Sequence, residues 1–374
     1  MRIAHVLPWP GIGGTERSTH QLTTFLEKRG HHNVAYCLPE ATRMRDFLAS
    51  SQIENTTYRA VQPSYRHPSD YFRASRELAA DFRRRRIDIV HCSDLLGVYY
   101  AVLAARLARL PLLSHVRCNF PEISRRDQSF LWHVNRFIFI SEAVRNGFAY
   151  RAGALKRGTV IYTGFDLQPD DRAAAAELLR KDCGIGVTDR IVGMVARVAE
   201  LKDFRTFAEA AAQILAIRSD VVFVVVGDYS QPQQKTHYNL VRSWIAELGI
   251  ESRFIFTGHR DDAARLLAGM DISVLCTHSE GFGRVVVESM FQGTPAVGTD
   301  TGGVSEIIRH GENGLLHKPK DPADLAGCLL KLLDDPAYAQ GIARSARVDA
   351  AARFGSAAFV EAIEKVYRSA GGSF

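Results

Sequence analysis

Short apolar runs alternate with amphipathic helical stretches along the whole chain. In the first half, the runs predicted to be strands are 2–7, 33–37, 88–92, 112–116, 137–140 and 159–162. The second half continues with predicted strands at 190–196, 221–226, 253–256, 272–275 and 296–298. Helical stretches such as 16–28, 70–86 and 96–108 lie between the strands. Alternation of this kind predicts an α/β fold with parallel sheets that helices cover on both faces.

The alternation occurs as two series, which predicts two Rossmann-like domains whose parallel sheets face each other across a cleft. We expect one domain at 1–165 and a second at 166–355, joined by a linker near 164–188 that contains an alanine-rich helix. The last segment, 356–374, is predicted to be a helix, and we expect it to pack back on the first domain. Open parallel sheets bind ligands at the carboxyl ends of their strands, so the site is expected in the cleft.

Composition is that of a globular enzyme, with 374 residues of which 46% are hydrophobic and 24% charged. No apolar run approaches the roughly 20 residues of a membrane span, and no signal segment precedes the first predicted strand. The six cysteines form no C-x-x-C pair, which favours a reducing compartment and argues against a zinc site. These features predict a cytoplasmic protein.

Basic residues are concentrated in the first half of the chain. Residues 1–165 contain 24 Lys or Arg and 13 Asp or Glu, whereas the remainder contains 23 and 28. Four arginines at 83–86 close the helix predicted at 70–86, in which Tyr71, Leu78 and Phe82 could form an apolar stripe. They are explained either by the helix dipole or by a basic amphipathic surface for anionic lipid. Two expectations follow: a solvated arginine-rich surface, or peripheral contact with the cytoplasmic face of an anionic membrane.

The segment 280–297 carries the most informative pattern of the chain. Glu280 follows a predicted buried strand, Gly281 and Gly283 form a turn, and a helix begins at Arg284. Backbone amides and the helix dipole at such a turn favour an anion such as a phosphate. Glu280 and Glu288 would flank that anion. Two acids that frame a phosphate pocket suit a ligand with hydroxyls at both ends, such as a nucleotide sugar.

Three further features lie at the ends of predicted strands, where a structural role competes with a functional one. Gly13 and Gly14 belong to a turn after the first strand, which either approaches a phosphate or only connects two elements. Arg197 and Lys202 follow the first strand of the second series, where two cations would neutralise a diphosphate leaving group. His115 lies at the end of the fourth strand and either donates to a sugar hydroxyl or is structural.

With further motifs, these residues resemble the retaining glycosyltransferases of family 4, which have the two-domain GT-B fold. The likeness extends from Met1 to at least Leu316, and the pair Glu280 and Glu288 is the E-x7-E signature of the family. The other matching segments, in chain order, are 13–16, 88–91, 139–142, 160–166, 195–202, 225–228, 257–260 and 302–303.

The resemblance implies a role for each matching residue. Arg197 and Lys202 would hold the donor diphosphate, and His115 would approach the donor sugar from the first domain. Glu280 would contact a sugar hydroxyl and Glu288 the donor ribose. His115, Arg197, Lys202 and Glu280 are predicted to be catalytic, and the other residues predicted to bind the donor are Gly13, Gly14, Arg260, Gly281, Phe282, Gly283, Arg284, Val285 and Glu288. The family needs no divalent metal and no cofactor.

Four positions depart from the usual pattern of the family. Asp203 replaces a glycine, Thr163 replaces an asparagine, and Cys276-Thr277 replaces a Pro-Ser pair. Arg284 replaces an aliphatic residue, and we hypothesise that it adds a cation near the sugar or near an acidic acceptor. Unchanged activity of Arg284→Leu on every donor and acceptor would remove this hypothesis.

The sequence thus predicts a retaining, metal-independent transferase that moves a hexosyl group from a UDP- or GDP-sugar to an acceptor hydroxyl. The basic charge favours an acceptor glycan or glycolipid in envelope polysaccharide or lipopolysaccharide assembly, and a small-molecule acceptor stays open. A nucleotide-sugar 2-epimerase of the same fold is one alternative; UDP released only when acceptor is present would exclude it. A less favoured alternative is an NAD-dependent oxidoreductase that uses the glycine-rich turn 11–14 with Glu40. No nucleic-acid partner is expected, because no reading motif occurs.

Overall fold

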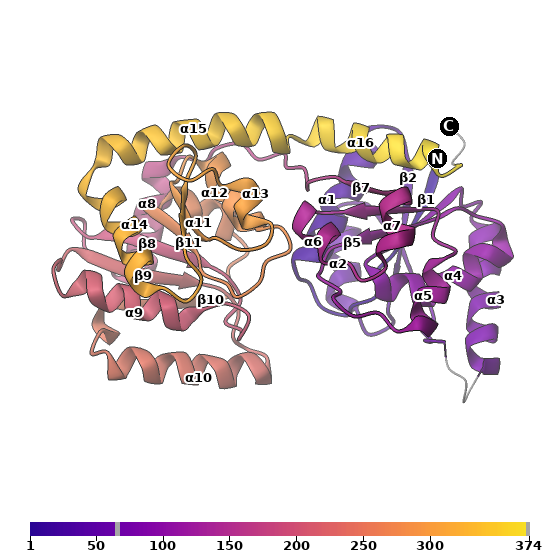
Figure 1. Ribbon diagram of the computed structural model, residues 1–374, viewed down its shortest axis with the longest axis horizontal. Coiled ribbons are helices and arrows are strands. Elements are labelled where there is room, and N and C mark those ends of the chain that lie inside the picture. The colour runs from indigo at the N-terminus through magenta and orange to yellow at the C-terminus, as the bar shows by residue number, and fades with distance from the viewer. Residues whose placement is uncertain (64–67, 372–374) are drawn as a thin grey trace. The chain divides into compact units, whose positions relative to one another are not determined.

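The computed structural model describes residues 1–63 and 68–371 (Figure 1). Two compact units are formed: unit 1 is Met1–Phe165 together with the chain from Ser356, and unit 2 is Asp166–Gly355. Each unit contains one parallel sheet with helices on its faces, which confirms the predicted pair of Rossmann-like domains. Among the residues described, no helix is long and apolar enough to cross a membrane.

Unit 1 has a seven-stranded sheet in the order β3-β2-β1-β4-β5-β6-β7. Its strands are β1 (Arg2–Val6), β2 (His32–Cys37), β3 (Glu54–Thr57), β4 (Ile89–Ser93), β5 (Leu112–Val116), β6 (Arg136–Phe139) and β7 (Gly158–Val160). Its helices are α1 (Gly14–Lys28), α2 (Thr42–Ser50), α3 (Pro68–Arg84), α4 (Leu95–Ala108), α5 (Arg125–Leu131), α6 (Glu142–Asn146), α7 (Arg151–Arg157) and α16 (Ser356–Ser369). The central strands β1, β4 and β5 are almost wholly buried, and each carries one buried histidine among its mainly apolar residues.

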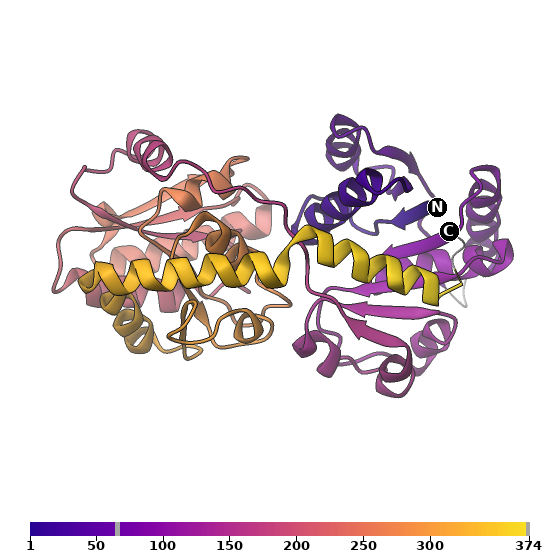
Figure 2. The ribbon, with the colours of Figure 1, turned by 90° about the horizontal axis from the view of Figure 1, so that it is seen from above.

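The last helix, α16, returns to unit 1 and lies over its sheet beside α1 (Figure 2). Phe359, Ile363 and Tyr367 are buried in one cluster with side chains from the sheet and from α1. The buried carboxylate of Glu364 adds a polar attachment: it lies 3.0 Å from His31 Nε2 and 3.1 Å from Arg29 Nη2. Apolar packing and this ion pair together hold α16 on unit 1.

Unit 2 has a six-stranded sheet in the order β10-β9-β8-β11-β12-β13. Its strands are β8 (Arg190–Val195), β9 (Val221–Val226), β10 (Phe254–Gly258), β11 (Ile272–Leu275), β12 (Ala296–Thr299) and β13 (Leu315–His317). Its helices are α8 (Arg172–Cys183), α9 (Phe204–Leu215), α10 (Pro232–Glu247), the 3-10 turn η1 (Glu251–Arg253), α11 (Ala263–Ala268), α12 (Arg284–Gln292), α13 (Val304–Ile307), α14 (Pro322–Asp334) and α15 (Pro336–Phe354). This order places β8, β11 and β12 side by side in the middle of the sheet.

The structure differs from the sequence prediction at three elements. Two edge strands, β3 and β13, were not predicted, because one has the polar sequence Glu-Asn-Thr-Thr and the other has only three residues. The alanine-rich helix predicted within the linker 164–188 is present as α8, but its assignment to a linker is wrong. Ala175 and Leu179 of this helix are fully buried, so α8 belongs to the core of unit 2.

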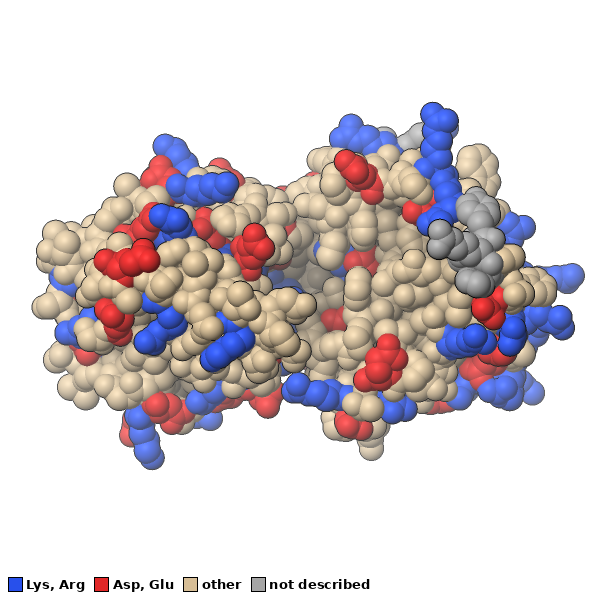
Figure 3. Space-filling model, turned by 90° about the horizontal axis from the view of Figure 1, so that it is seen from below, with Lys and Arg blue, Asp and Glu red and all other residues tan. Residues whose placement is uncertain are grey.

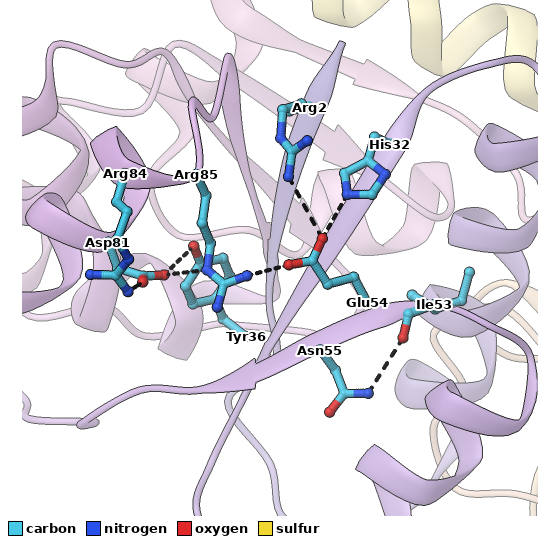
Figure 4. A network of polar contacts seen from close by, with 9 residues as sticks. All are labelled: Arg2, His32, Tyr36, Ile53, Glu54, Asn55, Asp81, Arg84 and Arg85. Carbon is cyan, nitrogen blue, oxygen red and sulfur yellow. Dashed lines mark hydrogen bonds and ion pairs between the residues drawn. The ribbon is translucent and has the colours of Figure 1, made fainter.

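Helix α3 buries the apolar stripe that made it a candidate membrane surface. Tyr71, Leu78 and Phe82 all face the interior of unit 1, so this stripe is not available to a bilayer. The arginine run that follows is partly paired within the unit: Arg85 lies between Asp81 and Glu54, and the Glu54 carboxylate also lies 2.6 Å from His32 (Figure 4). Several basic side chains of unit 1 nevertheless gather on the surface at the end that α3 forms (Figure 3).

Candidate active site

The carboxyl ends of the central strands of unit 2 bring several predicted site residues together. Strand β11 pairs with β8 on one side and with β12 on the other, so the loops that follow these strands are neighbours. Three hydrogen bonds join the first two loops: His278 N and Thr277 Oγ1 both donate to the Leu201 carbonyl, and Asp203 N donates to the Cys276 carbonyl. The loop that carries Lys202 is therefore fixed against the loop that carries Glu280.

Lys202 and Glu280 form the central ion pair of this edge. Lys202 Nζ lies 2.6 Å from Glu280 Oε2, and each side chain keeps about one-fifth of its surface exposed, at 19% and 21%. A charge-assisted hydrogen bond of this length, partly shielded from water, holds both ends of two otherwise flexible side chains. Lys202, which is predicted to bind the phosphates, and Glu280, which is predicted to bind the sugar, thus lie in direct contact.

Asp203, a departure from the family pattern, is explained by the helix that follows it. Its Oδ1 accepts from Thr206 N at 3.1 Å and its Oδ2 accepts from Thr206 Oγ1 at 2.7 Å, so Asp203 is the N-cap of α9. The backbone at Asp203 has φ −77°, a value open to any residue, so glycine is not required here. The cap fixes the residue next to Lys202 and so limits the motion of the lysine backbone.

The turn Glu280–Gly283 is packed against a second glycine turn, which follows β12. Gly283 has φ +101° and directs the chain into α12. The backbone of Gly303 donates to the Glu280 carbonyl at 3.0 Å. A Cβ atom at Gly302 would lie 2.1 Å from that same carbonyl oxygen, and one at Gly303 would lie 2.5 Å from the Gly281 carbonyl oxygen. Gly302 and Gly303 belong to the segments that resemble the family, but they were not predicted to be site residues. In the structure they pack against the Glu280–Gly283 turn and support it.

Arg284 and Glu288 lie one helical turn apart at the start of α12 and pair with each other. Arg284 Nη2 is 3.1 Å from Glu288 Oε1, and both side chains are about one-fifth exposed. Val285, between them, is half-buried. The hypothesised extra cation is therefore already adjacent to the carboxylate that is predicted to bind the ribose.

Three other predicted residues of unit 2 are placed differently. Arg197 follows β8, is exposed, and forms no ion pair with any residue of the described chain. Arg260 is held by two carboxylates: it is bidentate to Asp262 and lies 2.7 Å from Asp182 Oδ2. Phe282 is 3% exposed and its ring packs against Phe354, so only its backbone is presented at the turn. Donor binding by each of these residues stays a prediction.

Among the residues described, no metal cluster marks this edge of unit 2. Over residues 1–63 and 68–371, no three His, Cys, Asp or Glu side chains are grouped as metal ligands require. One hollow of unit 2, about 620 Å³, is lined by Arg190, Asp271 and Pro295, which lie at the amino ends of the strands and so on the opposite edge of the sheet. Metal independence stays a prediction.

The predicted residues of unit 1 lie at the carboxyl ends of β1 and β5. Gly13 is the N-cap of α1, and its amide donates to Glu16 Oε2 at 2.9 Å. Gly14 begins that helix. His115 is fully buried, with its Nδ1 3.2 Å from both His91 Nε2 and Arg117 Nη2. Burial, with the nearby Arg117 charge, holds the pKa of His115 well below its ordinary value, so its ring is neutral at physiological pH.

Asp94 is a residue of this edge that sequence reasoning missed. It follows β4 with φ +87° and ψ 173°, a backbone conformation that is strained for any residue except glycine. Its carboxylate is 3% exposed and accepts from Leu95 N at 2.9 Å, and burial raises its pKa to about 6. Strain and a raised carboxyl pKa at a strand end are typical of functional positions. The available signal was its place directly after a predicted strand.

The raised pKa of Asp94 predicts a pH-dependent effect of Asp94→Asn on stability. The native state binds the Asp94 proton more tightly than the unfolded chain does, so this contribution to stability is complete below about pH 4 and is lost as pH rises through 6. Asparagine does not titrate, so the stability of the variant relative to the wild type should rise by about 2 kcal/mol between pH 4 and pH 7. Urea unfolding at a series of pH values measures this difference; a difference independent of pH would contradict the assignment.

Comparison with known protein families agrees with this geometry. Residues 12–169 match the model described as Glycosyltransferase Family 4, and residues 176–349 match the model described as Glycosyl transferases group 1. The chain is 25% identical over 377 residues to N-acetyl-alpha-D-glucosaminyl L-malate synthase of Bacillus anthracis, which covers 96% of this chain and 94% of that protein. It is 30% identical over 271 residues to 2-deoxystreptamine glucosyltransferase of Streptomyces kanamyceticus, covering 70% and 68%.

Solved structures of similar fold include glycosyltransferases. HepE of Anabaena, solved in complex with UDP and glucose, superposes with a TM-score of 0.86 at 23% identity over 99% of this chain and 100% of that chain. A glycosyltransferase from Rickettsia africae superposes with a TM-score of 0.87 at 19% identity over 100% and 99%. The chain therefore belongs to the glycosyltransferases related to family 4, with the GT-B fold.

Proposed function

We propose that the protein transfers a sugar from a nucleotide-diphosphate donor to an acceptor hydroxyl with retention at the anomeric carbon. The observation that carries the proposal is the grouping in unit 2 of the Lys202–Glu280 pair with the start of α12, where Arg284 pairs with Glu288. Two cations, a helix start and two carboxylates at one sheet edge suit a diphosphate flanked by two sugars.

The chemistry requires a charged leaving group to be stabilised as the bond to the sugar breaks. Lys202 and the exposed Arg197 would neutralise charge that develops on the departing diphosphate, which is the largest requirement of the reaction. Glu280 would hold a hydroxyl of the transferred sugar and Glu288 the ribose. In front-face attack, a phosphate oxygen of the donor accepts the proton of the acceptor. No side chain is then required as a nucleophile.

Named relatives support a nucleotide-sugar donor. HepE was solved with UDP-glucose as well as with UDP and glucose, and that protein has the same fold. Two relatives are named for the sugars glucose and N-acetylglucosamine: 2-deoxystreptamine glucosyltransferase and N-acetyl-alpha-D-glucosaminyl L-malate synthase. We therefore infer a UDP-sugar donor, with a GDP-sugar as the alternative. No relative reported above is named as an oxidoreductase or an epimerase, so neither alternative gains support.

We infer an acceptor glycan, glycolipid or small molecule in cell-envelope assembly. Among solved structures of the same fold are the lipopolysaccharide glycosyltransferases WaaB and WaaG, at 17% and 16% identity. The basic surface of unit 1 near α3 would attract an acidic acceptor or the anionic face of the cytoplasmic membrane. Sedimentation with anionic and with neutral vesicles tests the membrane contact. The protein should sediment with the anionic vesicles and not with the neutral ones.

Thermal-shift measurements with UDP, GDP, ADP and their sugars test the donor class. A nucleotide that binds the native state at 100 times its Kd should stabilise it by about 2.7 kcal/mol. We expect UDP and a UDP-sugar to raise the Tm, and Lys202→Ala to reduce that rise. NMR of the product should then show the anomeric configuration of the donor. The proposal fails if none of the nucleotides raises the Tm or if the product has inverted configuration.

A further inference from the structure

Three histidines line up side by side in the middle of the unit 1 sheet. His5, His91 and His115 lie on the adjacent strands β1, β4 and β5, and all three are 0% exposed. The ring centroids of His5 and His91 are 5.2 Å apart, and those of His91 and His115 are 5.3 Å apart. Tyr367 of α16 reaches the middle ring, with its Oη 2.7 Å from His91 Nδ1. A row of buried polar rings in the core of a sheet requires that each ring atom be accounted for.

The contacts of His115 fix the position of its single ring proton. Its Nδ1 lies 3.2 Å from Arg117 Nη2, and a guanidinium only donates, so Nδ1 must accept. Burial and the Arg117 charge lower the pKa of His115 far enough that its ring is neutral. A neutral imidazole carries one N–H, so the proton of His115 is on Nε2.

The same reasoning extends through His91 to the C-terminal helix. His91 Nε2 also lies 3.2 Å from His115 Nδ1, and because that atom accepts, His91 Nε2 is the donor. The pKa of His91 is likewise lowered by burial and by His5, so its Nδ1 carries no proton and accepts from Tyr367 Oη. Burial raises the pKa of Tyr367, which keeps its hydroxyl protonated. The chain of donors runs from Tyr367 to His91 to His115.

We call this chain of hydrogen bonds, from Tyr367 through His91 to His115, the relay. Its last donor is His115 Nε2–H. His115 Nε2 is buried, and no residue of the described chain accepts a hydrogen bond from it. His5 Nδ1 is also buried without a partner, but it is an acceptor, because His5 Nε2 donates to Asn33 Oδ1 and the ring is neutral. Buried polar atoms are nearly always paired, so the N–H of His115 is the donor of this row that is available to water or to a bound ligand. His115 lies next to the last residue of β5, at the sheet edge where α/β proteins bind their ligands.

We propose that Tyr367 and His91 are positioning residues that lock His115 in the Nε2–H form and direct this N–H to a hydroxyl oxygen of the bound sugar substrate. The identity of the ligand rests on the proposed function, whereas the relay itself does not. The C-terminal helix would then contribute to the site without contacting substrate, through the buried hydroxyl of Tyr367 that reaches His91 of β4.

The relay is tested first by 15N NMR of the histidine rings in the full chain at neutral pH. We expect both His91 and His115 to show the neutral Nε2–H form, and removal of the Tyr367 hydroxyl in Tyr367→Phe to shift His91 Nδ1 towards the position of an unbonded nitrogen. An Nδ1–H form or a charged ring at His115 would overturn the proposal. This measurement does not depend on transferase activity, so it remains decisive if the proposed function fails.

Kinetics test whether the relay acts through His115. Tyr367→Phe is expected to lower kcat/KM for the donor about tenfold, and the matched control Tyr36→Phe should leave it unchanged. Tyr36 is equally buried in unit 1, but its hydroxyl donates to Asp81 at 2.7 Å. In a His115→Leu background, Tyr367→Phe should cause no further loss, because the residue it positions is absent. A tenfold loss that persists in that background would assign Tyr367 a merely structural role and overturn the proposal.

Discussion

Lys202→Ala is expected to lower the turnover number by about two to three powers of ten, the loss typical of removing one preorganised charge stabiliser. The ammonium group is only 19% exposed and lies 2.6 Å from Glu280, so it interacts with charge in a partly desolvated setting. Backbone hydrogen bonds from the β11 loop and the Asp203 cap fix the segment that carries it. Its position is therefore set before the donor binds, which is what stabilisation of a leaving group requires.

Steady-state kinetics with the donor identified by thermal shift measure this effect, and Arg205→Ala is the matched control. Arg205 is a cation three residues further along, but its side chain is 66% exposed and pairs with Glu209 on the surface of α9. Loss of this charge should change turnover less than twofold, because exposed ion pairs contribute little. Turnover of the wild-type magnitude in Lys202→Ala would remove Lys202 from the assigned role.

Buried elements were easier to predict from the sequence than exposed ones. Strands 112–116, 221–226 and 272–275 were predicted with the bounds that the structure has, because they are short, mainly apolar runs that are buried in the sheet. The edge strands β3 and β13 were missed, since an edge strand buries little and needs no apolar run. The predicted linker failed because the alanines of α8 carried a packing role that alanine composition alone does not reveal.

At the site, spacing along the chain predicted what a strand end can present, but not how side chains pair. The E-x7-E pattern placed Glu280 and Glu288 around one turn, and their partners Lys202 and Arg284 were predicted as well. Glu288 pairs with Arg284 one helical turn away, within α12, whereas the pairing of Glu280 with Lys202 depends on the strand order, which brings their two loops together. For Phe282, apolar character indicated burial, and the structure presents only its backbone.

The histidine row was within reach of the sequence, although it was not predicted. His5, His91 and His115 each lie in a predicted strand, and the strand order of Rossmann-like sheets makes those strands neighbours. Tyr367 was beyond reach, because its place depends on where α16 docks. Asp94 could be located at a strand end, but its positive φ cannot be inferred from residue type, since such strain is overcome only by the surrounding structure.

Gly302→Ala is expected to destabilise unit 2 by about 3 kcal/mol and to lower activity by about two powers of ten. The residue has φ +54°, and an added Cβ would lie 2.1 Å from the Glu280 carbonyl oxygen, an atom of the backbone that cannot rotate away. The Glu280–Gly283 turn must therefore shift, and the Gly303 N–H bond to the same carbonyl is strained. Glu280 and the start of α12 are then displaced together. A displacement of about 1 Å would misplace the residues predicted to bind the sugar and those predicted to bind the ribose of the donor.

Gly249→Ala separates the backbone strain from the collision. Gly249 also has positive φ, at +70°, but a Cβ there would have no atom within 4 Å. Its replacement should cost about 1 kcal/mol, the penalty of the left-handed backbone alone, and should leave activity unchanged. Urea unfolding and donor kinetics of both variants make the comparison. The two positions differ in that only the Cβ at residue 302 collides with the Glu280 carbonyl. If both variants lost the same stability and Gly302→Ala kept full activity, the second glycine turn would not support the Glu280 turn.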